Sequence, residues 1–258
     1  MRHTREMDMA GSKPLENKVA LVVGGGAYMG EAVALRFGRA GAAVVVADPD
    51  IDNARAVASA IEAAGSKALA VQVDTASSDS IDAMVQAAVD WAGRIDCVHQ
   101  GQYTIGTLKT VAETSNAEWH DTVDMDLHGP FYLCRAVAPH MMKQGSGSII
   151  LTTSGRGIYG SKDFGAYGTS MAGITGLMKT LQWELGEHGI TINCFVPGFV
   201  LHERVTKVMG MAKIDALREA APHKRLPTCE NIASFVLYLC TEGSFITGQV
   251  HMLATYTE

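Results

Sequence analysis

The stretch that decides the fold is residues 18–50, KVALVVGGGAYMGEAVALRFGRAGAAVVVADPD. An apolar run over 19–23 ends in three consecutive glycines, and apolar residues at helical spacing follow them. A second apolar run over 43–47 ends in Asp48. Short apolar strands that alternate with amphipathic helices predict a parallel sheet covered by helices on both faces.

The glycines at 24–26 predict a dinucleotide site. In a parallel sheet, the turn after the first strand points the N–H groups of a helix N-terminus at a ligand, which suits a pyrophosphate. An acid about 20 residues later accepts hydrogen bonds from the ribose hydroxyls of NAD and repels the extra phosphate of NADP. Asp48 therefore favours NAD over NADP. The alternative is that the glycines only shape the turn.

Composition indicates one globular domain with a small-molecule partner. The 258 residues are 47% hydrophobic, without a break in composition. The net charge of −6 and the lack of a large Lys/Arg cluster argue against a nucleic-acid or anionic membrane surface. No apolar run approaches the ~20 residues that span a bilayer.

The polar residues 1–16 lack the apolar core of a secretory signal, so we expect a flexible N-terminal tail before a domain over 17–258. The five cysteines are odd in number, scattered and without a CxxC pair. This pattern predicts reduced thiols and a cytoplasmic location.

The remaining chain continues the alternation. We expect strands at 68–73, 95–99, 148–153, 190–196 and 248–253, and helices at 51–64, 79–92, 117–142 and 165–187, with shorter helices near 203–220 and 229–241. The pattern predicts a doubly wound, seven-stranded parallel sheet.

Several motifs lie at the places that such a sheet gives them: GRID at 93–96, GPFYLCRAVAPHM at 129–141, GSIILTTS at 147–154, INCFVPG at 192–198 and TGQV at 247–250. With them, residues 17–253 resemble the short-chain dehydrogenase/reductase family. The resemblance implies a single Rossmann-like domain, a mobile lid over the substrate at about 199–220, and a homotetramer or homodimer. The assembly would form through the two long helices and the C-terminal strand.

The resemblance also implies a cofactor site. Asp48 would bind the adenosine ribose of NAD, and Asp74 would bind the adenine amino group. The full set of implied cofactor residues is Gly24, Gly26, Met29, Gly30, Asp48, Asp74, Pro197, Gly198 and Val200.

Ser154 and Tyr167, thirteen residues apart, match the catalytic pair of the family. The serine would polarise the substrate oxygen, and the tyrosine would act as its acid or base. Tyrosine ordinarily ionises near pH ~10, so it needs a nearby positive charge to work at neutral pH. The family places a lysine four residues after the tyrosine, where this chain has Met171. Arg156, His202 and His99 are candidates for the missing charge.

Other departures cluster at the nicotinamide end of the site. Tyr28 replaces the second glycine of the family's turn, and Val23 replaces the threonine before the first. The family's Asn-Asn-Ala-Gly run reads QGQY at 100–103. Asp126 stands at the position of the structural asparagine, and His202 replaces a threonine after Pro-Gly.

Candidates for the substrate pocket are Gln100, Arg156, Tyr159, Phe199 and His202. Apolar residues in the expected lid favour a small, mostly apolar substrate. The spacing of His120, Asp124 and His128 would suit a metal, but a solvated helix face is favoured because no fourth ligand is in reach. We therefore expect no metal.

Three functions remain open. An NAD-linked oxidoreductase acting on a hydroxyl or carbonyl is favoured, because Asp48 and Asp74 have no evident use without an adenosine. A non-redox acid/base enzyme, lyase-like or similar to the halohydrin dehalogenases, would use the same Ser154 and Tyr167. Halohydrin dehalogenases resemble this family, keep a Ser/Tyr pair, fill the cofactor site with bulky side chains and carry arginine where this chain has Met171. The third possibility is a catalytically silent ligand-binding homologue.

Overall fold

The structure, a computed structural model, describes residues 13–253 as one seven-stranded parallel sheet. The strand order is β3-β2-β1-β4-β5-β6-β7. The strands are β1 Val19–Val23, β2 Ala43–Asp48, β3 Ala68–Gln72, β4 Cys97–Gln100, β5 Gly147–Thr152, β6 Ile190–Val196 and β7 Val250–Met252. Val23 is in register with Ala47 on one side and Gln100 on the other, so β1, β2 and β4 end within one residue of each other. The predicted doubly wound fold is confirmed.

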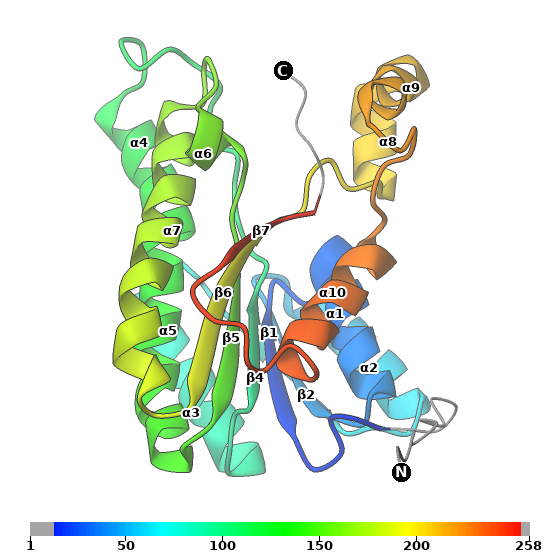
Figure 1. Cartoon of the computed structure of the whole chain (residues 1–258), viewed down its shortest axis with the longest axis vertical. Helices are drawn as coiled ribbons and strands as arrows, with labels where there is room; N and C mark the ends of the chain where they lie inside the picture. Colours follow the sequence, from blue (N-terminus) through cyan, green and yellow to red (C-terminus); the bar gives the residue numbers. More distant parts are fainter. Residues whose placement is uncertain (1–12, 254–258) are drawn as a thin grey trace, which may run out of the picture.

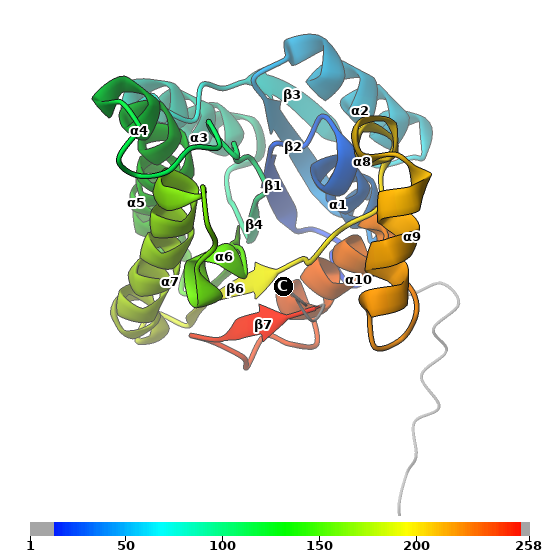
Figure 2. The ribbon, with the colours of Figure 1, turned by 90° about the horizontal axis from the view of Figure 1, so that it is seen from above.

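Helices cover both faces of the sheet, as Figure 2 shows from above. One face carries α1 (Tyr28–Arg39), α2 (Ile51–Ala63) and α10 (Cys229–Cys240), and the other carries α3 (Ser78–Ala92), α5 (Gly129–Gln144) and α7 (Gly165–Gly186). Each face has its own apolar core, with Phe37 and Phe195 in the first and Leu133 and Ile149 in the second. The strands are nearly continuous apolar runs because both of their faces are buried.

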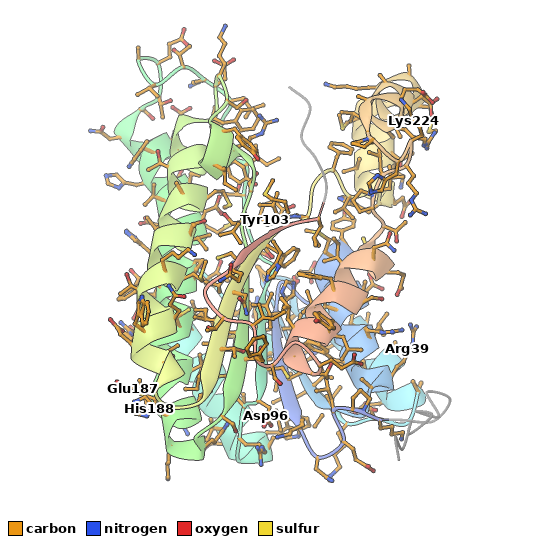
Figure 3. The ribbon with its side chains drawn as sticks, viewed as in Figure 1. Arg39, Asp96, Tyr103, Glu187, His188 and Lys224 are labelled. Carbon is orange, nitrogen blue, oxygen red and sulfur yellow. The ribbon has the colours of Figure 1, made fainter. Side chains whose placement is uncertain are left out.

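The remaining helices lie beyond the carboxyl ends of the strands: α4 (Asn116–Val123), α6 (Arg156–Tyr159), α8 (Glu203–Met209) and α9 (Met211–Ala220) (Figure 1). Figure 3 shows Tyr103 at this end of the sheet and Asp96 at the opposite end. Parallel α/β sheets bind ligands outside the carboxyl ends of their strands. The side with α6, α8 and α9 is therefore where a ligand is expected.

Asp96, in the GRID motif, holds the opposite end of the sheet together. Its carboxylate accepts hydrogen bonds from Arg94 at 2.6 and 2.7 Å, from Lys18 at 3.1 Å and from the N–H of Val19 at 2.9 Å. Burial acts to raise the pKa of Asp96, but these donors outweigh it and leave the pKa below its ordinary value. The role of this motif is structural.

The expectation of one long helix over 117–142 was wrong. A π-helical turn, Asp124–His128, separates α4 from α5. Pro130 is the second residue of α5 and has no N–H to donate to the preceding turn, so the regular hydrogen-bond ladder is interrupted there. The segment near 203–220 is likewise two helices, α8 and α9, which meet at Gly210 with φ of +74°.

Most of the expected tail over 1–16 lies outside the described residues. Residues 13–16 are described, and Leu15 is buried in the core with its N–H donating to the Ala40 carbonyl at 2.9 Å. Between residues 13 and 253, no helix is both long and apolar enough to cross a membrane.

Candidate active site

The glycine turn joins β1 to α1 by a very close backbone approach. A Cβ at Gly30 would lie 1.8 Å from the carbonyl oxygen of Gly24, so only glycine fits there. Gly24 has φ of +74°, which also favours glycine. The predicted cofactor residues Gly24, Gly26, Met29 and Gly30 all lie in this turn and in the first turn of α1.

Asp48, the last residue of β2, is tied to the glycine turn. One carboxylate oxygen accepts the N–H of Gly26 at 2.9 Å, and the other accepts the N–H of Asp50 at 3.0 Å. Each carboxylate oxygen can accept more than one hydrogen bond, so Asp48 remains able to bind ribose hydroxyls. The geometry fits the adenosine half of NAD.

Asp74 lies two residues after β3, at the same edge of the sheet, and its side chain is exposed. Its Oδ1 accepts the N–H of Ala76 at 3.0 Å, and its own N–H donates to Ser80 Oγ at 2.9 Å. These bonds fix the loop that carries the carboxylate.

Tyr28 departs most clearly from a dinucleotide site. Its φ is +51°, in the left-handed region that favours glycine, and 40% of its surface is exposed. Its ring packs on that of His202, with the centroids 4.2 Å apart and the planes at 37°. The pair lies at the N-terminus of α1, where the turn otherwise offers N–H groups to a pyrophosphate. The two rings therefore lie where a pyrophosphate would approach the turn.

Ser154 follows β5 and is 5% exposed. Its Oγ accepts the N–H of Arg156 at 3.3 Å. The adjacent Thr153 hydroxyl donates to the Met171 carbonyl at 2.8 Å, which ties this loop to α7. A Cβ at Gly157 would lie 2.5 Å from the Ala172 nitrogen, so α6 packs directly on α7.

Tyr167, in the first turn of α7, is 8% exposed among aromatic rings. Its ring centroid lies 6.4 Å from that of Tyr103 and 6.1 Å from that of Phe164. The guanidinium of Arg156 lies over the Phe164 ring, 3.7 Å from its centroid. Phe164 therefore contacts both Tyr167 and the charge of Arg156.

Met171 and Asp126 are the two residues expected at the positions of the family's lysine and asparagine. Met171 is fully buried in the apolar core with Ile174 and Cys194. Asp126 is fully buried in the π-helical turn, and its Oδ1 accepts the N–H of Thr104 at 2.7 Å. Its Oδ2 has no hydrogen-bond partner within the described part of the chain. Burial raises the pKa of Asp126 to about 7.

His99 does not meet the expectation that it is a candidate for the missing lysine charge. The ring of His99 is fully buried, with its centroid 5.9 Å from that of Phe195. Burial lowers the pKa of His99 to about 4. His99 is therefore neutral at physiological pH. Gln100, the next residue, is buried and donates its side-chain N–H to the Gln102 carbonyl.

A cavity of about 830 Å³ lies beside this region, and three predicted pocket residues, Arg156, Tyr159 and Phe199, line it. Gly198 lines it as well, between the buried Pro197 and Val200. Gln100 and His202 are not among its lining residues. The other lining residues are Leu217, Ala221, Pro222, His223, Arg225, Leu226, Pro227, Thr228, Asn231, Ile232, Phe235, Met252 and Leu253. Two of these, His223 and Arg225, belong to the basic stretch 223–225 that is visible in the sequence.

The histidines and carboxylates of α4 and the π-helical turn form a local pair: His128 Nδ1 lies 2.8 Å from Asp124 Oδ1. Within residues 13–253, no three His, Cys, Asp or Glu side chains are placed to hold one metal ion.

Comparison with known proteins identifies the class. A family model described as enoyl-(acyl carrier protein) reductase matches residues 26–254. This chain belongs to the short-chain dehydrogenase/reductase family, as its motifs predicted.

Two curated relatives illustrate the match. The hydroxy(phenyl)methylsuccinyl-CoA dehydrogenase subunit BbsD of Thauera aromatica is 34% identical over 239 residues, covering 92% of this chain and 94% of the relative. The cyclohexanol dehydrogenase of Acinetobacter sp. is 29% identical over 248 residues, covering 96% of this chain and 97% of the relative.

Among solved structures, a 7α-hydroxysteroid dehydrogenase in complex with NADH and 7-oxoglycochenodeoxycholic acid has a TM-score of 0.88. It is 28% identical to this chain, and the match covers 94% of this chain and 95% of the other.

Proposed function

We propose that this chain is an NAD-linked oxidoreductase that interconverts a hydroxyl and a carbonyl on a small, mostly apolar molecule. The observation that carries the proposal is the bond between Asp48 and the N–H of Gly26, which places a carboxylate at the first turn of the sheet. Ser154 and Tyr167 lie at the same carboxyl edge. Relatives named as dehydrogenases and reductases support redox chemistry in general.

Different residues of the chain would bind different parts of the dinucleotide. The turn residues Gly24, Gly26, Met29 and Gly30 would hold the pyrophosphate. Asp48 would hold the ribose, and its charge disfavours NADP. Asp74 would contact the adenine, and the segment Pro197, Gly198 and Val200 would border the nicotinamide end. When bound, NAD supplies the hydride acceptor or donor.

Ser154 and Tyr167 handle the substrate oxygen. Ser154 Oγ accepts the N–H of Arg156, and its hydroxyl would donate to that oxygen. Tyr167 moves the proton to or from the same oxygen. The rings of Tyr103 and Phe164 flank Tyr167 and keep it from bulk water.

The charge that supports an ionised Tyr167 comes from Arg156 in this proposal. Met171 brings none, and the buried His99 is neutral. The guanidinium of Arg156 acts across the Phe164 ring rather than beside the phenol. A weaker, more distant charge gives less stabilisation, so we expect turnover below that of lysine-containing relatives by a factor of about 10², or ~3 kcal/mol.

The second candidate function is acid/base chemistry without hydride transfer. The stacking of Tyr28 on His202 favours it, because the two rings fill space on the nicotinamide side of the turn. Ser154 and Tyr167 would still bind an oxygen and move its proton. A catalytically silent homologue is the outcome if neither reaction is found.

Two exposed aromatic residues support a homodimer or homotetramer. Trp183 on α7 is 78% exposed and Phe131 on α5 is 44% exposed, on the two long helices expected to pack against a second copy. Burying such rings between copies is favourable.

Residues 199–220 would act as the lid, with α8 and α9 turning about Gly210.

We also propose a cytoplasmic location, supported by five free thiols, of which Cys97, Cys134 and Cys194 are buried.

The test is the turnover of Tyr167→Phe and Ser154→Ala with NAD and a panel of cyclic alcohols and ketones. We expect each variant to lose at least about 10² in kcat, because each removes a group that acts on the substrate oxygen. Tyr238→Phe, an exposed tyrosine on α10, is the matched control and should keep full activity. Unchanged activity of Tyr167→Phe would refute the proposed role of the phenol.

A further inference from the structure

The cavity of about 830 Å³ is lined by α6, by the segment after β6, and by the turn that joins α9 to α10. Its volume is typical of pockets that enclose a small organic ligand. One wall residue, Arg156, also contacts a proposed catalytic residue, because its backbone N–H donates to Ser154 Oγ. Ser154 and Tyr167 are not lining residues themselves, so Arg156 is the residue that links the cavity to Ser154.

One part of the wall is apolar and comes from separate elements. Phe199 follows β6, Ile232 and Phe235 belong to α10, Leu226 precedes α10, and Leu253 follows β7. Burial of an apolar ligand surface against these side chains is favourable.

The charged part of the wall has a single sign. Arg156 and Arg225 line the cavity, and no Asp or Glu is among the described residues that do so. Arg156 contacts the Phe164 ring and the Ser161 hydroxyl, and neither it nor Arg225 forms an ion pair with a carboxylate between residues 13 and 253.

Neighbouring cations differ in this respect. Lys224 pairs with Glu219 at 3.7 Å, and Arg218 pairs with Asp215 at 2.5 Å. In a chain with a net charge of −6, two guanidinium groups that have no carboxylate partner within residues 13–253 are a local excess of positive charge on one cavity. Guanidinium groups bind carboxylates through paired hydrogen bonds.

We propose that this cavity binds an amphipathic organic acid, with its apolar body against Phe199 and Phe235 and its carboxylate between Arg156 and Arg225. The proposal deepens the proposed function by naming the substrate class, and it rests on that function only for calling the ligand a substrate. A carboxylate at the arginines is a fixed point from which the rest of the molecule extends toward Ser154.

The test compares two probes of equal shape, 4-phenylbutyrate and 4-phenylbutanamide, by calorimetric titration at low salt. We expect the acid to bind at least tenfold more tightly than the amide. Arg225→Gln and Arg156→Gln should each reduce that preference to less than threefold. The backbone bond from residue 156 to Ser154 is unaffected by the side-chain change.

Lys224→Gln is the matched control, since it removes the same charge from the adjacent residue, which does not line the cavity. Figure 3 shows Lys224 on the outer part of the lobe formed by α8 and α9. This variant should keep the tenfold preference. The proposal is overturned if the intact protein binds acid and amide equally or fails to bind the acid. It is also overturned if Arg225→Gln keeps the tenfold preference for the acid. The same holds if Lys224→Gln reduces that preference as much as Arg225→Gln does.

Tyr167→Phe separates this proposal from the proposed function. The variant should bind 4-phenylbutyrate as the intact protein does, because the phenol is not part of the cavity wall. A preference for the acid without any NAD-linked turnover would support the acid site and refute the oxidoreductase. NAD-linked turnover without a preference for the acid would support the oxidoreductase and refute the acid site.

Discussion

The ring centroid of Tyr28 lies 4.2 Å from that of His202, and the two planes are tilted by 37°. Tyr28 opens α1, whereas His202 precedes α8 in the segment expected to act as a lid. The contact therefore joins the glycine turn to the lid across the expected nicotinamide side of the site. Whether a dinucleotide displaces this contact decides between the two candidate functions.

The backbone at Tyr28 predicts an unusual order of stability among variants. With φ of +51°, a residue with a Cβ is disfavoured there by about 1 kcal/mol relative to glycine. Tyr28→Gly and Tyr28→Ala both lose the ring, so their comparison isolates the backbone. We expect Tyr28→Gly to be more stable than Tyr28→Ala by about 1 kcal/mol in urea unfolding. Equal stabilities would show that residue 28 does not adopt this conformation.

Asp126 predicts a pH dependence of stability. Its pKa is about 7 in the folded protein against an ordinary value of 3.8. Between these values the folded state binds more protons at this site than the unfolded state, so the free energy of unfolding falls as pH rises. Over this pH range, the free energy of unfolding falls by at most about 4 kcal/mol because of Asp126.

Asp126→Asn is the matched variant, because an amide stays neutral and its oxygen can still accept the Thr104 N–H. The intact protein should lose stability relative to this variant as pH rises from 4 to 7, measured by urea unfolding at each pH. A stability difference that is constant over this range would contradict a raised pKa at Asp126.

His99 should remain neutral across the physiological range, because burial holds its pKa at about 4. Its neutral form contributes stability that is present above pH 6.5 and is lost as pH falls toward 4. In NMR spectra of histidine-labelled protein, the Cε1 proton of His99 should keep one shift from pH 8 to 5. His99→Gln identifies the signal. A titration midpoint near 6.5 would restore His99 as a source of positive charge.

The sheet was predictable because its sequence signals are local. Buried parallel strands are continuous apolar runs, and Gly24, Gly30 and Asp48 mark the first turn and the second strand end. The break in the helix before Pro130 was not predicted, because the apolar spacing continues through the π-helical turn. Hydrogen bonding, rather than hydrophobic pattern, sets that break.

The site was predictable in part. The roles of Ser154 and Tyr167 stay predictions from the family resemblance, whereas Arg156, Tyr159 and Phe199 line a cavity in the structure. The sequence did not reveal Arg225 as a wall residue, because the turn after α9 is brought there only by the tertiary fold. Nor did it indicate that Tyr28 stacks on His202, since the two are far apart in the chain.

The most direct test of the proposed function is a titration of the purified protein with NADH, followed by nicotinamide fluorescence, with Tyr28→Gly and NADPH in parallel. We predict that the unaltered protein binds NADH with a micromolar Kd and binds NADPH at least tenfold more weakly, because of Asp48. Binding of NADH by Tyr28→Gly alone would contradict the oxidoreductase. It would mean that Tyr28 closes the cofactor site and that Ser154 and Tyr167 serve chemistry without hydride transfer.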